Sequence, residues 1–484
     1  MSSEAIDEAE LIREYTLELR NKNSAIFVGA GFSVASGYVD WKGLLKDIFE
    51  DLRLDPDKEK DLVTVAQYHC NQSAGNKSAL TQKIMAEFCI VKSPTKNHEI
   101  LANLPIQTYW TTNYDKLIEK ALENAKKVAD IKYSIDQLSV TRPDRDVIVY
   151  KMHGDIDHPS ETIINKDDYE AYPLKMSQFV AALRGDLVAK TFLFLGFSFT
   201  DPNIDYILSR VRAQYDKHQR MHYCILKKVA KVPNEKACDF KYRQLKQEYF
   251  IRDLKRVGIK TVLVNDYSDI TILLEKIAAS YKQYSIFVSG SAEEYGKWSK
   301  NTAQEFIHKL SYTIAKNKNR VITGFGLGVG SAVINGTLSF LDNDGKTISD
   351  DEIVMRPFPQ VATGSKSLTC LWDEYRKAMI SHAGLAIFVF GNKRDKTDKI
   401  VLADGMRREF DQCGALGVIP IPIGATGYMA KDLWNDVNDN VANYFPKEKT
   451  QFVSKKLKTL GDETKTPDEL ISVIMELIQY LQKG

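Results

Sequence analysis

The sequence predicts an α/β protein made of two units, each with a parallel sheet that helices cover on both faces. Short apolar segments recur along the chain, and stretches with helical periodicity separate most of them, which is typical of such sheets. The chain has 484 residues, too many for one core at roughly 100–200 residues per domain. A strand that runs into glycines occurs near the start of each half, which indicates that a second α/β unit follows the first.

The charge and composition are those of an ordinary globular protein. Lys and Arg number 66 and Asp and Glu number 64, a net charge of +2, so no basic surface indicates a nucleic acid or an anionic membrane as partner. No apolar run approaches the ~18 residues of a membrane span. The charged N-terminal residues lack the apolar stretch of a signal peptide. We therefore expect a cytoplasmic protein that binds neither nucleic acid nor membrane.

The cysteines are scattered. No two of them form a C-x-x-C pair, which argues against a disulfide framework and against a zinc ribbon. A reducing cytoplasm is the simplest setting for this pattern, and we expect no metal. The six positions are Cys70, Cys89, Cys224, Cys238, Cys370 and Cys413.

Six apolar segments are expected as strands of the first unit, which we place at residues 1–283. A polar, aromatic-bearing stretch from Asp155 to Lys190 interrupts the alternation of strands and helices. We expect it to form a small inserted subdomain that covers one side of a cleft. The expected strands lie at residues 25–30, 108–115, 147–154, 191–199, 221–228 and 260–266.

The second unit is expected at residues 284–484. Its strands begin near Tyr284 and Asn319, and two more follow in the segments 385–393 and 417–427. Between and after them, helical periodicity predicts helices at Lys297–Lys318, Leu368–His382, Asp404–Gly414 and Pro467–Gln482.

The first strand runs into Gly29-Ala30-Gly31. Glycines there let the backbone turn sharply and come close to a ligand, and the N–H groups of a following helix would favour a pyrophosphate. A plain turn is the alternative. The segment also fails G-x-G-x-x-G, because Val34 stands three residues after Gly31.

Asn113 in "TTNYD" and His153 in "KMHGDI" follow two further strands. Taken singly, the Asn could cap the next helix and the His could be structural. Ligands of open α/β sheets, however, bind outside the carboxyl ends of the strands, where Gly29, the segment 195–205 and Asn265 would also lie. Five such strand ends with small or polar residues indicate a binding site at this edge.

In this order, the motifs "GAGFSVASGYVDW", "TTNYD", "MHGD", "LGFSFTDPN" and "VND" resemble the sirtuin family of NAD-consuming enzymes, over roughly residues 20–280. The resemblance implies that the glycines admit the NAD+ pyrophosphate, that the loop from Ser36 to Trp41 is mobile, and that Asn113 and His153 are catalytic. The NAD+-binding residues it implies are Gly29, Ala30, Gly31, Ser33, Ser36, Asp40, Trp41, Asp115, Gly196, Ser198 and Asn265.

Cleavage of the nicotinamide–ribose bond suits these residues. Nicotinamide leaves readily through an oxocarbenium-like state, so the enzyme must mainly orient the ribose and supply a nucleophile. The amide of Asn113 could hold ribose hydroxyls and a water. An imidazole such as His153 suits a general base at neutral pH, acting on the water directly or through a ribose hydroxyl. Asp115 is a third candidate, which could instead serve the next helix.

One departure from the sirtuin pattern bears on the substrate. Protein-deacylating sirtuins carry a four-cysteine zinc module shortly after the H-G pair, and residues 155–190 here contain no cysteine. We therefore expect an NAD+ glycohydrolase with water as acceptor. A protein deacylase that consumes NAD+ is one alternative, which would need the cysteines. A non-catalytic nucleotide sensor is the other, which would not need Asn113 and His153.

The second unit carries four alternating glycines, from Gly324 to Gly330, after a strand. A glycine-tolerant turn is the alternative reading, and charges on the helices that follow are mostly solvated. The stretch resembles the SLOG family, Rossmann-like domains that bind nucleotide-derived ligands. On that resemblance, basic side chains meet a pyrophosphate and a glutamate accepts from ribose or base. The ligand-binding residues it implies are Ser289, Gly290, Ser291, Gly324, Gly326, Gly328, Arg376, Lys393 and Glu409.

A sirtuin-like unit followed by a SLOG unit resembles the effectors of the bacterial Thoeris anti-phage system. This resemblance implies an NAD+ hydrolase that stays silent until a cyclic ADP-ribose isomer, made by a TIR-domain partner, binds the second unit. It also implies a homo-oligomer, a tetramer, that rearranges or stacks when the ligand binds. The identity of the isomer stays open.

Overall fold

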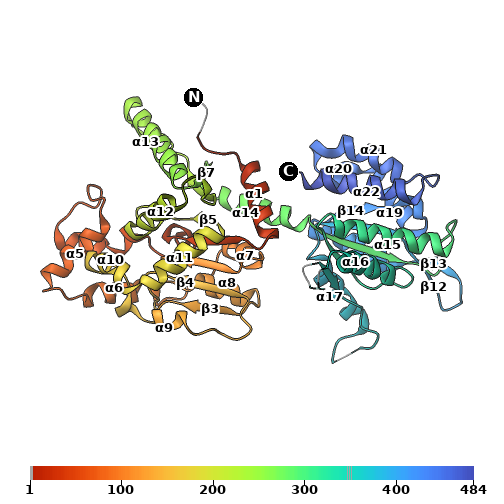
Figure 1. Cartoon of the computed structure of the whole chain (residues 1–484), viewed down its shortest axis with the longest axis horizontal. Coiled ribbons are helices and arrows are strands. Elements are labelled where there is room, and N and C mark those ends of the chain that lie inside the picture. The colour runs from red at the N-terminus through yellow and green to blue at the C-terminus, as the bar shows by residue number, and fades with distance from the viewer. Residues whose placement is uncertain (1–3, 346, 348, 350–351, 363, 484) are drawn as a thin grey trace. The chain divides into compact units, whose positions relative to one another are not determined.

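The computed structural model describes residues 4–483 except 346, 348, 350, 351 and 363. The chain forms two compact units, Met1–Ala278 and Ala279–Gly484, and Figure 1 labels many of their helices and strands. The division falls within the helix Asp269–Lys282, and the expected boundary at residues 283–284 lies just after this helix.

The first unit has helices between its successive strands, with six helices in a row between the first strand and the second. Its elements are α1 (Glu8–Arg20), β1 (Ser24–Val28), α2 (Ala30–Ser33), α3 (Trp41–Leu44), α4 (Lys46–Leu52), α5 (Leu62–Gln72), α6 (Ser78–Phe88), α7 (Lys96–Asn103), β2 (Thr108–Thr111), α8 (Leu117–Asn124), β3 (Ala129–Lys132), α9 (Ile135–Leu138), β4 (Val147–Lys151), α10 (Lys166–Lys175), α11 (Ser177–Ala189), β5 (Thr191–Leu195), α12 (Pro202–Tyr215), β6 (His222–Lys227), α13 (Ala237–Arg256), β7 (Ile259–Val264) and α14 (Asp269–Lys282).

Seven strands form the sheet of this unit, in the order β3-β4-β2-β1-β5-β6-β7, and every neighbouring pair is parallel. The residues of β1, β2 and β5 are all buried, which explains why these strands are continuous apolar runs. All six expected strands are present. The seventh strand, β3, lies at one edge of the sheet and was not predicted, because it carries Asp130 and Lys132 and lacks an apolar run.

The expected inserted subdomain at residues 155–190 is only partly present. Helix α11 packs directly into the core of the sheet and is an ordinary crossover helix. Helix α10 contributes Tyr172 to the same core and also packs against α5. A further helical layer, α3–α6, has a core of its own around Leu45, Phe49 and Ile84. The sequence did not separate these cases, because an amphipathic helix has the same periodicity whether it covers a sheet or another helix.

The second unit has a smaller sheet and more helix. Its elements are β8 (Ser285–Ser291), α15 (Lys300–Lys316), β9 (Arg320–Thr323), α16 (Gly330–Asn343), β10 (Ile353–Met355), α17 (Leu368–Ile380), β11 (Leu385–Phe390), β12 (Asn392–Arg394), β13 (Ile400–Leu402), α18 (Asp404–Leu416), β14 (Ile419–Pro422), α19 (Tyr428–Asp439), α20 (Val441–Tyr444), α21 (Thr450–Leu460) and α22 (Pro467–Gln482).

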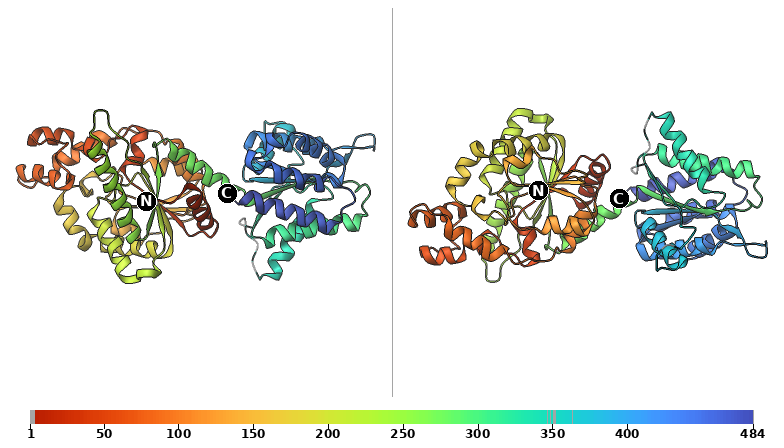
Figure 2. Two further views of the ribbon diagram at one scale, coloured as in Figure 1. Left: turned by 90° about the horizontal axis from the view of Figure 1, so that it is seen from above. Right: turned by 90° about the horizontal axis from the view of Figure 1, so that it is seen from below.

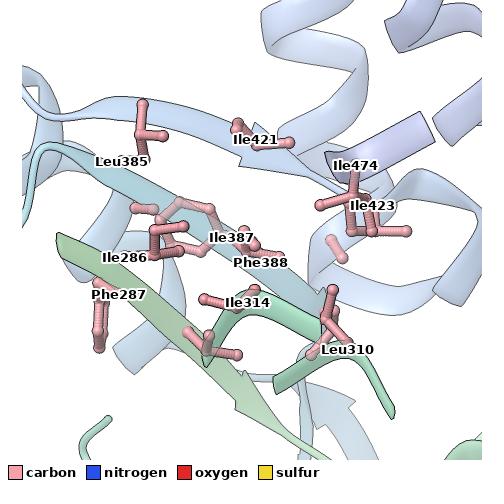
Figure 3. Close-up of a cluster of buried hydrophobic side chains, with 14 of the residues drawn as sticks. Ile286, Phe287, Leu310, Ile314, Leu385, Ile387, Phe388, Ile421, Ile423 and Ile474 are labelled. Atoms are coloured by element: carbon pink, nitrogen blue, oxygen red, sulfur yellow. The ribbon is translucent and has the colours of Figure 1, made fainter. Parts of the chain in front are cut away.

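Five parallel strands form this sheet in the order β10-β9-β8-β11-β14, with helices on both of its faces (Figure 2). Figure 3 shows its core, where Ile387 of β11 lies among side chains from β8, β14, α15 and α22. The four expected helices are present, and α22 has the predicted bounds because Thr466 and Glu469 form a capping box at its start. The short strands β10, β12 and β13 and the helices α16 and α19–α21 were not predicted.

No helix among the described residues is long and apolar enough to cross a membrane. The six cysteines are free thiols, of which Cys70, Cys224 and Cys413 are buried.

Helices α15 and α16 pack closely because α16 carries a glycine where they meet. A Cβ atom at Gly336 would lie 2.1 Å from the carbonyl oxygen of His308 and 2.2 Å from the hydroxyl oxygen of Ser311, both on α15. Neither helix can accept a methyl group there without moving apart.

We predict that Gly336→Ala lowers the free energy of unfolding by about 1–3 kcal/mol, the usual cost of overpacking a core. Gly414→Ala in α18 is the matched control. A Cβ atom there meets nothing within 4 Å, so it should raise stability by about 0.5–1 kcal/mol. Urea unfolding followed by circular dichroism measures both, and equal stabilities for the two variants would contradict the close-packing account.

Candidate functional site

The carboxyl edge of the first sheet has a crevice position between β1 and β5. After β1 the chain continues to β2, which lies on one side of β1 in the sheet, whereas β5 lies on the other side of β1. The strand order thus reverses between β1 and β5, and ligands of such sheets bind at this reversal. A Cβ atom at Gly29 would lie 2.5 Å from the carbonyl oxygen of Gly196, and one at Gly196 would lie 2.2 Å from the backbone nitrogen of Phe32. The amide of Gly31 also donates to the carbonyl of Gly196 at 3.0 Å. The glycines therefore let the two loops lock together.

Asn113 lies at this edge and reaches toward the first loop. Its amide nitrogen donates to the carbonyl of Gly29 at 3.1 Å and to the hydroxyl of Ser33 at 2.9 Å. Ser33 in turn donates to a carboxylate oxygen of Asp115 at 2.7 Å. The other oxygen of Asp115 accepts from the backbone N–H of Leu117 at 2.9 Å, so Asp115 and not Asn113 supports the start of α8.

A buried lysine fixes the loop that carries Asn113. Lys151, at the end of β4, is fully buried, and its ammonium group donates to the backbone carbonyls of Tyr114 and Asp115 at 3.1 and 2.6 Å. It also pairs with Glu119 at 2.9 Å and with Asp155 at 2.5 Å. Two carboxylates and two carbonyls compensate for burial of the charge, as a buried lysine requires.

His153 lies two residues beyond the end of β4 and is 1% exposed. Its Nε2 atom is 3.1 Å from a carboxylate oxygen of Asp201. The rings of Tyr169 and Tyr172 from α10 meet the imidazole edge-on, with centroids 5.3 and 6.3 Å away. Burial alone would raise the pKa of Asp201, but His153 and the backbone N–H groups of α12 outweigh it, so the pKa is lowered.

Several buried polar atoms at this edge have no hydrogen-bond partner among the described residues. An unpaired buried polar atom costs about 1–3 kcal/mol, and such atoms in a native protein call for an explanation. A bound ligand or water that pairs with them supplies one. They are Oγ of Ser36, Oδ1 of Asn113, Nδ1 of His153, the hydroxyl of Tyr172 and Nδ2 of Asn203. Nε2 of His153 has the ion-pair contact with Asp201.

The space beside Asn113 is narrow. A cavity of about 20 Å³ lies there, lined among others by Ser33, Asp40 and Trp41, which is room for about one water molecule. Asp40 caps α3 and Trp41 begins it, so the loop that was expected to bind the cofactor forms one wall. A larger cavity of about 630 Å³ shares Phe88 with the narrow one.

Two of the expected NAD+-binding residues lie apart from this cluster. Asn265 follows β7, three strands away from β1, and is exposed. Ser198 is exposed and hydrogen-bonds Thr200 at 2.7 Å. Asp201 does not stand out in the sequence as a site residue, because an Asp before a Pro at the start of a helix is typical of an ordinary N-cap.

The carboxyl edge of the second sheet holds a second cluster. Ser289 of β8 donates to Glu409 of α18 at 2.6 Å, and the other carboxylate oxygen of Glu409 lies 3.7 Å from Nε of Arg376 on α17. Arg376 pairs with Asp373 at 3.0 Å, and its guanidinium lies over the ring of Phe358. Burial raises the pKa of Glu409. The hydrogen bond from Ser289 and the charge of Arg376 lower this pKa and so offset part of the effect of burial.

Lys393 joins this cluster through the start of α18. It lies on β12 and forms an ion pair with Asp404, the first residue of α18. The next residue, Gly405, borders the guanidinium of Arg376, since a Cβ atom there would lie 3.3 Å from Nη2. The first turns of α18 therefore bring together three charged side chains from three elements, namely Arg376, Lys393 and Glu409.

The glycine loop after β9 crosses the end of β8. A Cβ atom at Gly326 would lie 1.9 Å from the carbonyl oxygen of Gly290, and one at Gly328 would lie 2.0 Å from that of Ala292. A Cβ atom at Gly324 would lie 2.8 Å from Cε2 of the Phe358 side chain. Ser291 instead points across to β12, where it donates to the carbonyl of Asn392 at 3.1 Å.

Within the part of the chain that the structure describes, no three His, Cys, Asp or Glu side chains are grouped so that they could hold a metal ion.

Comparisons with known proteins agree with this architecture. Residues 107–253 match the SIR2-like domain family, and residues 269–481 match the Sir2- and TIR-associating SLOG family. Over 470 residues the chain is 49% identical to the NAD(+) hydrolase ThsA of Bacillus cereus (strain MSX-D12), covering 97% of this chain and 98% of that protein. It is 44% identical over 476 residues to the NAD(+) hydrolase ThsA of Acinetobacter baumannii (strain 532279), with 97% and 98% covered.

A more distant relative matches only part of the chain. The Defense-associated sirtuin 2 of Bacillus subtilis is 27% identical over 212 residues, which is 42% of this chain and 20% of that protein. The near-complete matches at 44–49% identity carry the assignment. With a SIR2-like domain followed by a SLOG domain, the chain belongs to the ThsA family of NAD(+) hydrolases.

Proposed function

We propose that the first unit hydrolyses NAD+ to ADP-ribose and nicotinamide. The observation that carries this proposal is that Asn113 and His153 follow the neighbouring strands β2 and β4 at one sheet edge, both buried and both with a polar atom that lacks a partner among the described residues. The names of the ThsA relatives, NAD(+) hydrolases, support it. Water is the acceptor, and we propose no metal, because residues 155–190 lack the cysteines of the deacylase zinc module.

The proposed roles follow from the free hydrogen-bonding capacity of each side chain. The amide oxygen of Asn113 accepts from a ribose hydroxyl or a water, while its nitrogen stays bound to Gly29 and Ser33. As the nicotinamide–ribose bond breaks and water bonds to the ribose carbon, His153 takes the proton that the water releases. Gly29, Ala30 and Gly31 face the pyrophosphate at the start of α2.

We predict that Asn113→Ala and His153→Ala each lower the turnover of NAD+ about 10²- to 10⁴-fold, the range that positioned acid–base groups contribute. Nicotinamide release from NAD+ by the purified full chain measures this, with circular dichroism to check that each variant folds. A folded variant with wild-type turnover would show that the role given to its residue is wrong.

We propose further that the second unit binds a cyclic ADP-ribose isomer made by a TIR-domain partner, and that this signal activates the hydrolase in anti-phage defence. Arg376 and Lys393 meet the pyrophosphate, and Glu409 accepts from ribose or base. The ion pairs of these residues with Asp373 and Asp404 would be exchanged for contacts with the signal. The Sir2- and TIR-associating SLOG family match supports a signal-sensing role.

We propose that the signal acts by widening the narrow space beside Asn113. A cavity of about 20 Å³ is far below the roughly 300–1,000 Å³ of ligand pockets, so NAD+ requires the wall formed by Asp40 and Trp41 to move. The signal would bind more tightly to the form in which this wall is open. Binding of the signal and binding of NAD+ would then be coupled, since each favours the same form.

We predict that Arg376→Ala raises the signal concentration needed for half-activation about 10- to 100-fold, because a charge-assisted contact contributes about 1.5–3 kcal/mol. Lys377→Ala, an exposed neighbour on α17, is the control and should respond like the wild type. Calorimetry with cyclic ADP-ribose isomers measures binding, and NAD+ turnover measures activation. Equal affinity of Arg376→Ala and wild type would overturn the assignment of this site.

We also propose that the chain works as a homotetramer in the cytoplasm, which stacks when the signal binds. Light scattering of the purified chain should give the mass of four chains without the signal and a larger mass with it. Monomers under both conditions would remove this proposal.

A further inference from the structure

The imidazole of His153 has one anionic neighbour in the described structure, the carboxylate of Asp201. One oxygen of this carboxylate is 3.1 Å from Nε2 and also accepts from the hydroxyl of Tyr169 at 3.4 Å. Both side chains are taken out of water, with 1% of His153 and 9% of Asp201 exposed. At this separation in a buried site, the charge of the carboxylate acts on the ring with little screening.

Helix α12 keeps Asp201 in place and ionised. The second carboxylate oxygen accepts from the backbone N–H groups of Asn203 and Ile204, at 2.9 and 3.1 Å, so Asp201 is the N-cap of a 14-residue helix. The positive end of the helix dipole favours a negative charge there. The carboxylate is therefore held by three elements of the unit before any ligand binds.

We propose that Asp201 is a positioning residue for the hydrolysis, which orients the ring of His153 and stabilises its protonated form. This inference rests on the proposed function. As water attacks the ribose carbon, its proton passes to His153 and the bonding electrons of the nicotinamide–ribose bond leave with nicotinamide. The imidazolium then lies beside an anion and later releases the proton to solvent, while Asp201 stays ionised throughout.

Among the described residues that face the ring of His153, Asp201 is the charged one. The titratable groups that face His153 are Asp201 at the start of α12 and Tyr169 and Tyr172 on α10. Burial raises the pKa of both tyrosines far above the neutral range, so they stay uncharged. Removal of the carboxylate charge thus removes the group that favours the imidazolium.

Asp201→Asn is the sharpest test, because asparagine caps helices as well as aspartate and keeps the hydrogen bonds to α12. We expect kcat to fall about 10²-fold or more, at the low end of the contribution of a positioned acid–base group, with KM for NAD+ near the wild-type value. The acidic limb of the kcat–pH profile should move to lower pH, because a less stable imidazolium loses its proton at lower pH. The same shift should be seen in the titration of His153 by ¹³Cε1 NMR of histidine-labelled protein, assigned with His153→Gln.

Asp61→Asn is the matched control, since Asp61 is the exposed N-cap of α5 and should leave both the rate and the pH profile unchanged. Asp201→Ser, which also caps a helix, repeats the test if the first variant does not fold. A folded Asp201 variant with wild-type kcat and an unshifted profile would overturn the inference, while an inactive His153→Ala leaves the proposed function standing. Activity retained by a folded His153→Ala would instead overturn the role of His153 in the proposed function, and with it this inference. Failure of both Asp201 variants to fold would show that the carboxylate serves the fold and not the ring.

Discussion

Close contact between backbones at the carboxyl ends of parallel strands fixes both candidate sites. In the first unit the loop after β1 lies against the loop after β5, and in the second the loop after β9 lies against the end of β8. Each contact is so close that glycine is needed, since Cβ atoms at Gly29 and Gly326 would lie 2.5 and 1.9 Å from carbonyl oxygens. The polar residues that follow these strands are brought together because the glycines allow the loops to meet.

Buried charge organises the first site in a second way. Lys151 ties the loop of Asn113 to β4 through two backbone carbonyls, and Asp201 ties the ring of His153 to α12. Both charged groups are compensated by partners that the fold supplies. Functional side chains held by such compensated neighbours need little rearrangement when the reaction begins, which is the property that preorganised sites share.

The second cluster is also built around charge. Glu409 is buried and hydrogen-bonded by Ser289, Arg376 is buried and pairs with Asp373, and Lys393 pairs with Asp404 at the surface. The Lys393–Asp404 pair is exposed, and exposed ion pairs contribute little to stability, so breaking this pair costs little. The two units match the SIR2-like and SLOG families.

The sequence alone determined the α/β class, the strands with continuous apolar runs and the helices with strong end signals. Buried parallel strands and capped helices are encoded by neighbouring residues, as in β1 and α22. The placement of Asn113 and His153 at one edge of the sheet could also be predicted, because the carboxyl ends of parallel strands share one edge. The polar edge strand β3 and the helical layer α3–α6 could not, since neither has a local pattern of its own.

Only the tertiary structure decided how the site residues are held. Asp201 reads as a helix cap in the sequence, and its contact with His153 depends on α12 and β4 meeting at the same edge. Asn265 matches a motif, yet the strand order places it three strands from β1. Residue types and their spacing are local properties, whereas the distance between two side chains from separate elements is set by how the strands and helices pack.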